Sequence, residues 1–335
     1  MSRLRPAAPS PSSRAPGLPD VIPLAARPVF SVDATTYTWG DVVLAARGTG
    51  SWAEIERRAF EGLACEARAG ARGESVPADD LRAAAGAFRY AHDLLSGDEL
   101  EAWLERWSLG LDDWLGYLRR RLLRERGPEK ASAPAGEAPE AAAAVWAEAV
   151  CSGALAGFAR DLAARAAVWE RDAAGSAPLP EPGRLEEVVG RFRARAATAE
   201  AVSKEIERHR LDWLQLEVLT AAFADEDAAR EAALCVDEDG LSLKEAARLA
   251  GTDVRLVAGM LDELDPALTA VLVGARPGEL VGPVRLGAEV TLAALRSRRP
   301  PTAADPDVRA RAERAVASRA VEREERDRVR WLEHI

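Results

Sequence analysis

The sequence predicts a mostly α-helical protein with one small α+β unit in its C-terminal third. Apolar residues recur at three- to four-residue spacing through most of the chain, which is the period of an amphipathic helix. Two later stretches, 211–220 and 284–295, instead alternate apolar with polar residues, as half-buried strands do. Pro277-Gly278 and Pro300-Pro301 bound the second stretch on either side, and Gly287 indicates a bend or hairpin within it.

The N-terminal part predicts a tail, two short strands and then helices. Residues 1–25 are rich in proline, serine and alanine, which is typical of a flexible tail. Residues 28–38 predict a strand, a turn and a second strand, and Thr38 offers an N-cap for the following helix. Apolar spacing predicts a further helix after Ser51 and three closely linked helices between residues 78 and 122.

Three tryptophans lie in these linked helices, after a capping box formed by Ser96 and Glu99. Trp103, Trp107 and Trp114 recur at helical spacing, and clustered aromatic residues suggest either a ligand cage or a core. Aromatic residues at this spacing are more often packing residues. We therefore assign all three to the core.

Two composition breaks divide the following helical region. The best linker candidate is the run at about 127–139, and a second Pro/Gly-rich run covers residues 175–183. Residues 140–169, between the two breaks, predict one long alanine-rich helix, and residues 185–208, after the second break, predict another. The chain is therefore predicted to be nearly all α up to residue 208.

Beyond that point the pattern predicts a mixed unit and a final helix. A helix at 225–236 follows the strand, and a second at 241–249 has Ser242 as its cap. The final helix begins at Asp305, with Pro306 in its first turn. Its inward-facing residues are predicted to be Val308, Ala312, Ala315, Val316 and Ala320.

Composition excludes several classes of function. The chain has a net charge of −10, whereas proteins that bind DNA or RNA usually carry an excess of positive charge. No stretch of about eighteen apolar residues exists, and the first residues lack the apolar core of a signal peptide. We therefore expect no nucleic acid or membrane partner and a cytoplasmic location.

The cysteines and histidines predict neither a metal nor another cofactor. Cys65, Cys151 and Cys235 are odd in number and far apart, which favours reduced, buried residues over a disulfide framework. The histidines are equally scattered, at positions 92, 209 and 334, so local spacing assembles no ligand set.

Three motifs near the C-terminus carry a resemblance to a known family. Gly278–Val284 reads GELVGPV, Gly287–Val290 reads GAEV, and Arg299–Pro301 reads RPP. These motifs resemble the end of a parvulin-type peptidyl-prolyl isomerase domain, and the order of elements matches from about residue 211 to 301.

Further segments resemble SurA-like chaperones and the parvulin-related proteins of bacterial peptide-modifying systems. They are VFSVDATTYTW, the helical run that starts at AAGAFRY, and the exit that starts at DPDVRAR. The resemblance implies an N-terminal helical chaperone-like module at 26–208 and an inserted parvulin-like domain at 209–301. The C-terminal helix, 302–335, would pack back on the N-terminal module.

The catalytic residues of the resembled family are missing. Parvulin active sites use two facing histidines, whose positions here fall among residues 213–217 and at Glu289. The family's Gly-Gly-x-Leu-Gly loop is absent, because residues 251–266 read GTDVRLVAGMLDELDP. The resemblance therefore implies a catalytically degenerate member that keeps the scaffold.

Such a scaffold still binds peptide if a strand edge is exposed, because an extended chain adds to the edge by main-chain hydrogen bonds. The strand 213–220 is the candidate edge, with Trp213 as an anchor or as a plain core residue. The candidate peptide-binding residues are Trp213, Gln215, Glu217, Glu289 and Thr291.

Three hypotheses of function remain open at this point. The first is a peptide-binding, chaperone-like protein that holds a precursor peptide while partner enzymes convert it into a ribosomally made natural product. The second is an active prolyl isomerase or peptide-cyclising enzyme that uses other residues, such as Glu289, Glu217 or His209. The third is a helical scaffold protein.

Overall fold

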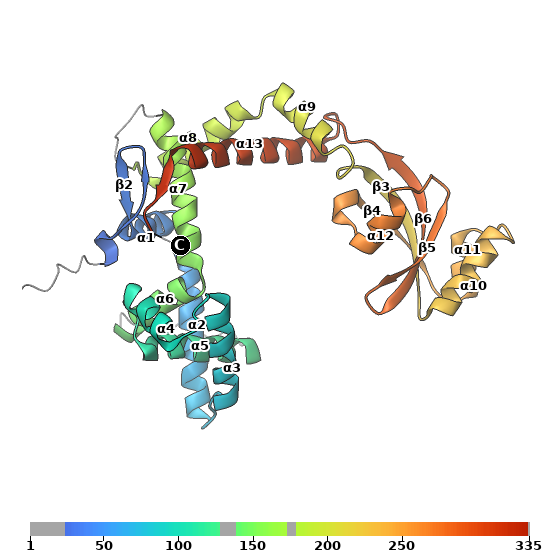
Figure 1. Cartoon of the computed structure of the whole chain (residues 1–335). Helices are drawn as coiled ribbons and strands as arrows, with labels where there is room; N and C mark the ends of the chain where they lie inside the picture. The colour runs from blue at the N-terminus through green and yellow to red at the C-terminus, as the bar shows by residue number, and fades with distance from the viewer. Residues whose placement is uncertain (1–23, 128–138, 173–178, 334–335) are drawn as a thin grey trace, which may run out of the picture. The chain divides into compact units, whose positions relative to one another are not determined.

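The computed structural model describes residues 24–127, 139–172 and 179–333 (Figure 1). The protein is mostly helical with two small antiparallel sheets, so the predicted fold class is confirmed. The predicted tail at 1–25 and linker at 127–139 lie outside the described residues, apart from their ends.

The chain divides into two compact units. Unit 1 comprises Met1–Val189 and Val321–Ile335, and unit 2 comprises Gly190–Ala320. The division falls inside two helices, α8 (Pro182–Ala196) and α13 (Pro306–Arg328). The boundaries expected after residues 208 and 301 lie within unit 2, because Ile206 before the first and Val308 after the second share a core cluster with Trp213.

Unit 1 contains a three-stranded antiparallel sheet in the order β2-β1-β7. Strands β1 (Pro28–Val32) and β2 (Thr35–Thr38) form the predicted pair. The third strand, β7 (Val329–Trp331), comes from the C-terminal end of the chain and pairs with β1, which the sequence pattern did not predict. Two segments that lie about 300 residues apart, β1 and β7, are therefore joined within one sheet.

Helices make up the rest of unit 1, and its core includes the predicted tryptophans. Trp107 and Trp114 are buried and Trp103 is half-buried against them, so their assignment to the core is confirmed. The helices are α1 (Trp39–Gly48), α2 (Ser51–Ala71), α3 (Ala78–Ala91), α4 (Gly97–Arg106), α5 (Leu111–Arg126), α6 (Pro139–Cys151) and α7 (Ala154–Asp172), after a 3₁₀ turn at Leu24–Ala26.

Two helices predicted as continuous are in fact broken. The stretch 140–169 divides into α6 and α7 at Gly153, whose φ of +76° ends α6. The stretch 185–208 divides into α8 and α9 (Ala199–Arg208), because the Thr198 hydroxyl accepts a 3.2 Å hydrogen bond from the Ala201 N–H and caps α9. No single described helix is long and apolar enough for a membrane span; α6 and α7 pass only together, with a 69° bend.

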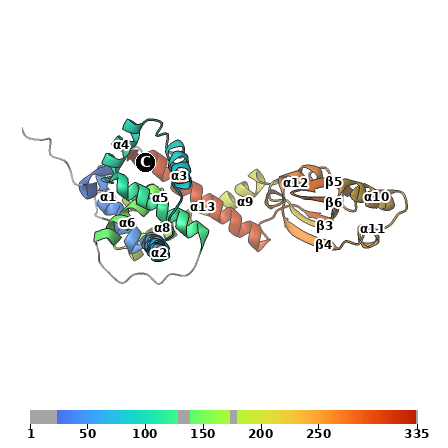
Figure 2. The same ribbon diagram turned by 90° about the horizontal axis from the view of Figure 1, so that it is seen from below.

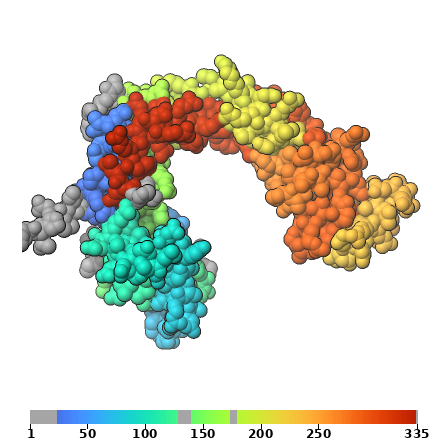
Figure 3. Space-filling model, in the orientation of Figure 1, coloured from blue at the N-terminus to red at the C-terminus, as the bar shows by residue number. Residues whose placement is uncertain are grey.

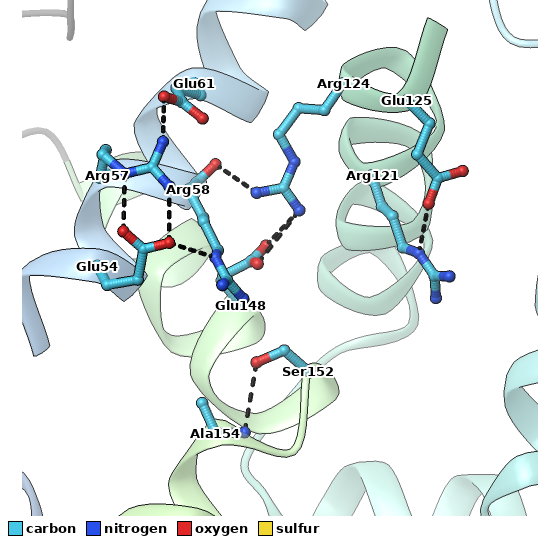
Figure 4. A network of polar contacts seen from close by, with 10 residues as sticks. All are labelled: Glu54, Arg57, Arg58, Glu61, Arg121, Arg124, Glu125, Glu148, Ser152 and Ala154. Atoms are coloured by element: carbon cyan, nitrogen blue, oxygen red, sulfur yellow. Dashed lines mark hydrogen bonds and ion pairs between the residues drawn. The ribbon is translucent and has the colours of Figure 1, made fainter. Parts of the chain in front are cut away.

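A partly buried ion pair joins three helices of unit 1 (Figure 4). Arg124 of α5 donates to the backbone carbonyl of Arg58 in α2 at 2.9 Å and to both carboxylate oxygens of Glu148 in α6 at 3.2 Å. Glu148 is buried, so this pairing offsets the cost of removing its charge from water.

Unit 2 is built on a four-stranded antiparallel sheet in the order β4-β3-β6-β5. The strands are β3 (Gln215–Phe223), β4 (Val254–Met260), β5 (Leu280–Leu286) and β6 (Glu289–Arg299). Around them lie α10 (Glu226–Asp237), α11 (Leu243–Leu249), a 3₁₀ turn (Leu261–Glu263) and α12 (Pro266–Leu272). The predicted cap Ser242 begins α11, whereas Asp225, predicted as the first residue of a helix, is the N-cap of α10. Strands β5 and β6 form the hairpin expected around Gly287.

Helices cover both faces of this sheet (Figures 1 and 2). Leu216 and Val218 pack on one face against α12, whereas Ala221 and Phe223 pack on the other against α10 and α11. At a bulge in β5, Gly282 has a φ of +111°, and a Cβ there would lie 2.9 Å from the Thr291 carbonyl oxygen. Glycine is therefore required at this position.

Candidate functional site

The sheet of unit 2 does not carry the histidine pair of the resembled family. Unit 2 contains one histidine, His209, which lies in the turn after α9. Its ring stacks on Trp213 at 4.7 Å between centroids. The Nδ1 atom lies 3.2 Å from Asp212 Oδ2, and the Nε2 atom lies 3.3 Å from Glu205 Oε1. The ring is therefore held by α9 and the following turn.

Trp213 lies in the core of unit 2. Residues 209–213 form turns and β3 begins at Gln215, so Trp213 precedes the strand. Its side chain is only 4% exposed, and the Arg311 guanidinium lies 5.2 Å from the centre of the ring. The surrounding apolar residues are Val202, Ile206, Met260, Val308 and Ala312. The core interpretation of Trp213 is therefore confirmed.

The other four predicted site residues do not converge. Successive side chains on a strand point to opposite faces. Gln215 and Glu217 therefore lie on the face opposite α12, because Leu216 packs against α12. Glu289 and Thr291 share the α12 face with Ala293 of the same strand.

The two pairs also lie at opposite ends of the sheet. Gln215 is paired with Arg299 at the end of β6, whereas Phe223 is paired with Val290 beside the β5–β6 turn. Glu289 is exposed at that turn, and Thr291 is buried. The predicted five-residue constellation is thus not one site.

Strand β3 is not the sheet edge that the sequence pattern predicted. It pairs with β4 on one side and with β6 on the other, so an added chain has no free backbone there. The sequence pattern does not predict the neighbouring strand β4, because residues 251–266 stand where the resembled family has a catalytic loop. Its run of Val254, Arg255, Leu256 and Val257 is a strand signal, since β-branched and apolar residues follow Gly251.

Strand β4 is an open edge. The Leu261 N–H donates a 2.9 Å hydrogen bond to the Leu214 carbonyl, which fixes the order of the ladder between β4 and β3. In an antiparallel pair, successive residues bond alternately toward and away from the partner strand. The backbone groups of Leu256 and Ala258 therefore point away from β3. The Met260 N–H points the same way and donates to Glu263 Oε2 at 3.1 Å.

The two edges of the sheet differ in how they are protected. Strand β5 contains Pro283, which has no N–H, beside the bulge between Val281 and Val284. Both features discourage strand addition. Strand β4 has neither proline nor bulge, and its Leu256 side chain is 53% exposed.

A cavity of about 540 Å³ adjoins the C-terminal half of β4. Arg311 donates to Asp262 Oδ2 at 2.6 Å and to Glu263 Oε1 at 3.0 Å, which ties α13 to the turn after β4. The guanidinium groups of Arg299 and Arg314 form no hydrogen bond or ion pair with the residues that the structure describes, although the charge of Arg299 contributes to the lowered pKa of Asp305. The lining also includes Gln215, Leu216, Glu217, Ala258, Gly259, Met260, Asp305 and Asp307.

The Asp305 carboxylate, which lines this cavity, accepts hydrogen bonds at neutral pH. The Gln215 side-chain amide donates to Asp305 Oδ2, and the N–H groups of Val308 and Asp307 donate to Oδ1. These hydrogen bonds, that of Gln215 above all, lower the pKa of Asp305. An ionised carboxylate accepts hydrogen bonds but cannot act as a general acid. The cavity is thus suited to binding polar groups.

Comparisons with known proteins name only distant neighbours. No model of a known protein family matches the chain, and no curated protein matches it in sequence. The solved structures that are similar include the foldase protein PrsA from Streptococcus pneumoniae str. Canada MDR_19A, with 9% identity over 90% of this chain and 93% of that chain and a TM-score of 0.26. The foldase PrsA from Lactococcus lactis gives 8% identity over 92% and 95%, with a TM-score of 0.27.

A third similar structure belongs to work on PEB4 and Cj1289, two SurA-like chaperones of Campylobacter jejuni. It gives 10% identity over 92% of this chain and 99% of that chain, with a TM-score of 0.19. Because the TM-scores are only 0.19 to 0.27, no activity, substrate or site residue of this chain is inferred from these structures.

Proposed function

We propose that this protein is a chaperone-like peptide-binding protein that adds an extended chain to the open edge of β4. The observation that carries the proposal is the unpaired backbone of Leu256 and Ala258, on a strand that neither proline nor a bulge protects. An extended chain satisfies such groups with its own N–H and C=O groups, so main-chain hydrogen bonds supply the affinity.

The surroundings of β4 supply selectivity. Leu256 presents an apolar contact to an added strand, and the adjoining cavity presents the guanidinium groups of Arg299 and Arg314. Alternate side chains of an added strand face the same side of the sheet. A bound peptide therefore places an apolar residue near Leu256 and polar residues beside the cavity.

The proposal includes no prolyl-isomerase turnover. Rotation of a peptide bond has a barrier of about 18–20 kcal/mol, and the resembled family meets it with two facing histidines. Here, the strand positions that would carry them hold other residues, and His209 is held outside the sheet. We assign the bound chain to a cytoplasmic precursor peptide that partner enzymes modify, on the basis of the sequence resemblance given above.

Replacing Ala258 by proline tests the proposal. Proline removes the outward N–H at this position, whereas Ala258→Ser keeps it and is the matched control. We expect fluorescence polarisation to show micromolar binding of an extended peptide by the wild type and by Ala258→Ser, and at least about tenfold weaker binding by Ala258→Pro. The measurement uses a panel of extended peptides, which includes the precursor peptide encoded next to the gene of this protein.

Circular dichroism would first establish that both variants are folded. Equal affinities of the two variants would contradict strand addition at β4. Failure of the wild type to bind any peptide of the panel would contradict peptide binding altogether. Turnover in a protease-coupled prolyl assay, lost in Glu289→Ala, would instead favour the isomerase hypothesis.

A further inference from the structure

A groove on unit 1 has no part in the proposed function of β4. It has a volume of about 740 Å³ and lies along α4 and the turn that leads to α5. These helices belong to the teal surface of unit 1 in Figure 3. Its lining consists of Gly97 and of leucines and glutamates, namely Leu100, Glu101, Leu104, Glu105, Leu109 and Leu111.

The floor of the groove is apolar because the chain reverses after α4. Ser108 adopts a φ of +52°, and the Leu109 N–H donates a 2.9 Å hydrogen bond to the Leu104 carbonyl. This turn brings Leu109 beneath the end of α4, where both leucines are buried. Leu111 follows at the start of α5 and is 55% exposed, so the apolar floor continues to the surface.

One flank of the groove carries two carboxylates without a cation. Glu101 and Glu105 lie one helical turn apart and are both exposed. Neither forms an ion pair with any described residue, and no lysine or arginine lines the groove. Like charges at this spacing repel each other. On α2, by contrast, Glu54 and Glu61 both pair with Arg57.

We propose that this groove docks a basic, amphipathic peptide segment. An apolar side chain of the segment covers Leu104 and Leu109, and a lysine or arginine lies between Glu101 and Glu105. Charge complementarity selects this partner, because the flank is acidic and the floor apolar. The volume falls within the range of about 300–1,000 Å³ that is common for ligand pockets.

The test measures the binding of a fluorescein-labelled amphipathic peptide of leucine and lysine to the full chain by fluorescence polarisation. The double variant Glu101→Lys, Glu105→Lys reverses the charge of the flank from negative to positive. The variant Glu231→Lys with Glu238→Lys makes the same change of net charge on unit 2, at two exposed glutamates. We expect the first variant to bind about tenfold more weakly and the second to stay within about twofold of the wild type.

Two further measurements address the apolar floor and the sign of the charge. Leu111→Gln shortens the floor at an exposed position, and we expect it to weaken binding of the same peptide about threefold. A peptide of leucine and glutamate should bind the flank-reversed variant better than it binds the wild type.

Several outcomes would overturn the inference. Equal losses in the two charge-reversal variants would show that the overall charge of the protein attracts the peptide. Equal binding of the lysine and glutamate peptides by the wild type would exclude a role of the acidic flank. Sedimentation that shows a dimer lost in the flank-reversed variant would assign the groove to a second copy of the chain.

Discussion

The side-chain amide of Gln215 donates a 2.7 Å hydrogen bond to Asp305 Oδ2 and so joins the first residue of β3 to the cap of α13. The other oxygen of Asp305 accepts hydrogen bonds from the N–H groups of Asp307 and Val308. One carboxylate therefore fixes the start of α13 beside the C-terminal end of β4, where the cavity of unit 2 lies.

Asp305→Ala removes both contacts. We expect the melting temperature to fall by about 2–4 °C at neutral pH, which is the usual effect of losing an N-cap in a protein of this size class. Because the folded protein lowers the pKa of Asp305, its contribution is present above about pH 4 and is lost as the pH falls further. Melting curves of the wild type and the variant should therefore converge in acid.

Asp305→Asn is the matched control, since asparagine also caps helices. We expect it to lose less stability than Asp305→Ala. A constant difference between the wild type and Asp305→Ala from neutral pH to below pH 4 would contradict the role of the charged carboxylate.

Leu256→Lys places a charge on the open strand edge. Charged residues at edges oppose strand addition, so we expect at least about fivefold weaker peptide binding with little change of stability. Leu249→Lys, at an exposed position at the end of α11, is the control and should bind as the wild type does. Isothermal titration with the same extended peptide measures both, and equal affinities would argue against β4 as the site.

Trp213→Ala separates a core residue from a binding anchor. Because Trp213 is buried among apolar residues, we expect the free energy of unfolding to fall by about 3–5 kcal/mol in denaturant titrations. Leu211→Ala, at an exposed position two residues earlier, should change it by less than about 0.5 kcal/mol. Weaker peptide binding by a Trp213→Ala protein of unchanged stability would restore the anchor interpretation.

Tyr37→Phe tests a buried hydrogen bond of unit 1. The Tyr37 hydroxyl donates at 2.9 Å to Glu170, which is also buried. Removing the hydroxyl leaves the carboxylate without this partner, and we expect a loss of about 1–3 kcal/mol in denaturant titrations at neutral pH. Tyr90→Phe, at an exposed position, is the control and should be neutral.

The hydrogen bond between Tyr37 and Glu170 also predicts that the free energy of unfolding falls at alkaline pH. Burial, followed by the hydrogen bond to Glu170, raises the pKa of Tyr37. Its contribution is therefore present below about pH 10 and is lost as the pH rises further, because the unfolded chain ionises first. The wild type should lose stability above that pH more steeply than Tyr37→Phe, and parallel curves would contradict this.

Local signals were sufficient for most helix starts and for the class of fold. The capping boxes at Thr38 and Ser96 and the cap at Asp305 involve residues within three positions of each other, so a short window of sequence contains the whole interaction. Helix breaks were harder to predict. Gly153 and Thr198 each interrupt an otherwise continuous apolar pattern, and the interruption depends on one residue.

The amino-acid pattern alone determined that the chain is mostly helical, that a hairpin surrounds Gly287, and that no histidine stands among residues 213–217 or at position 289. Backbone pairing between strands far apart in the sequence decided the arrangement of the sheet in unit 2. Only the register of β3 with β4 and β6 shows that β3 is internal, that β4 is the open edge, and that Glu217 and Glu289 lie on opposite faces. Strand neighbours are set by backbone hydrogen bonds between distant residues, and alternation within one strand says nothing about which strand will lie beside it.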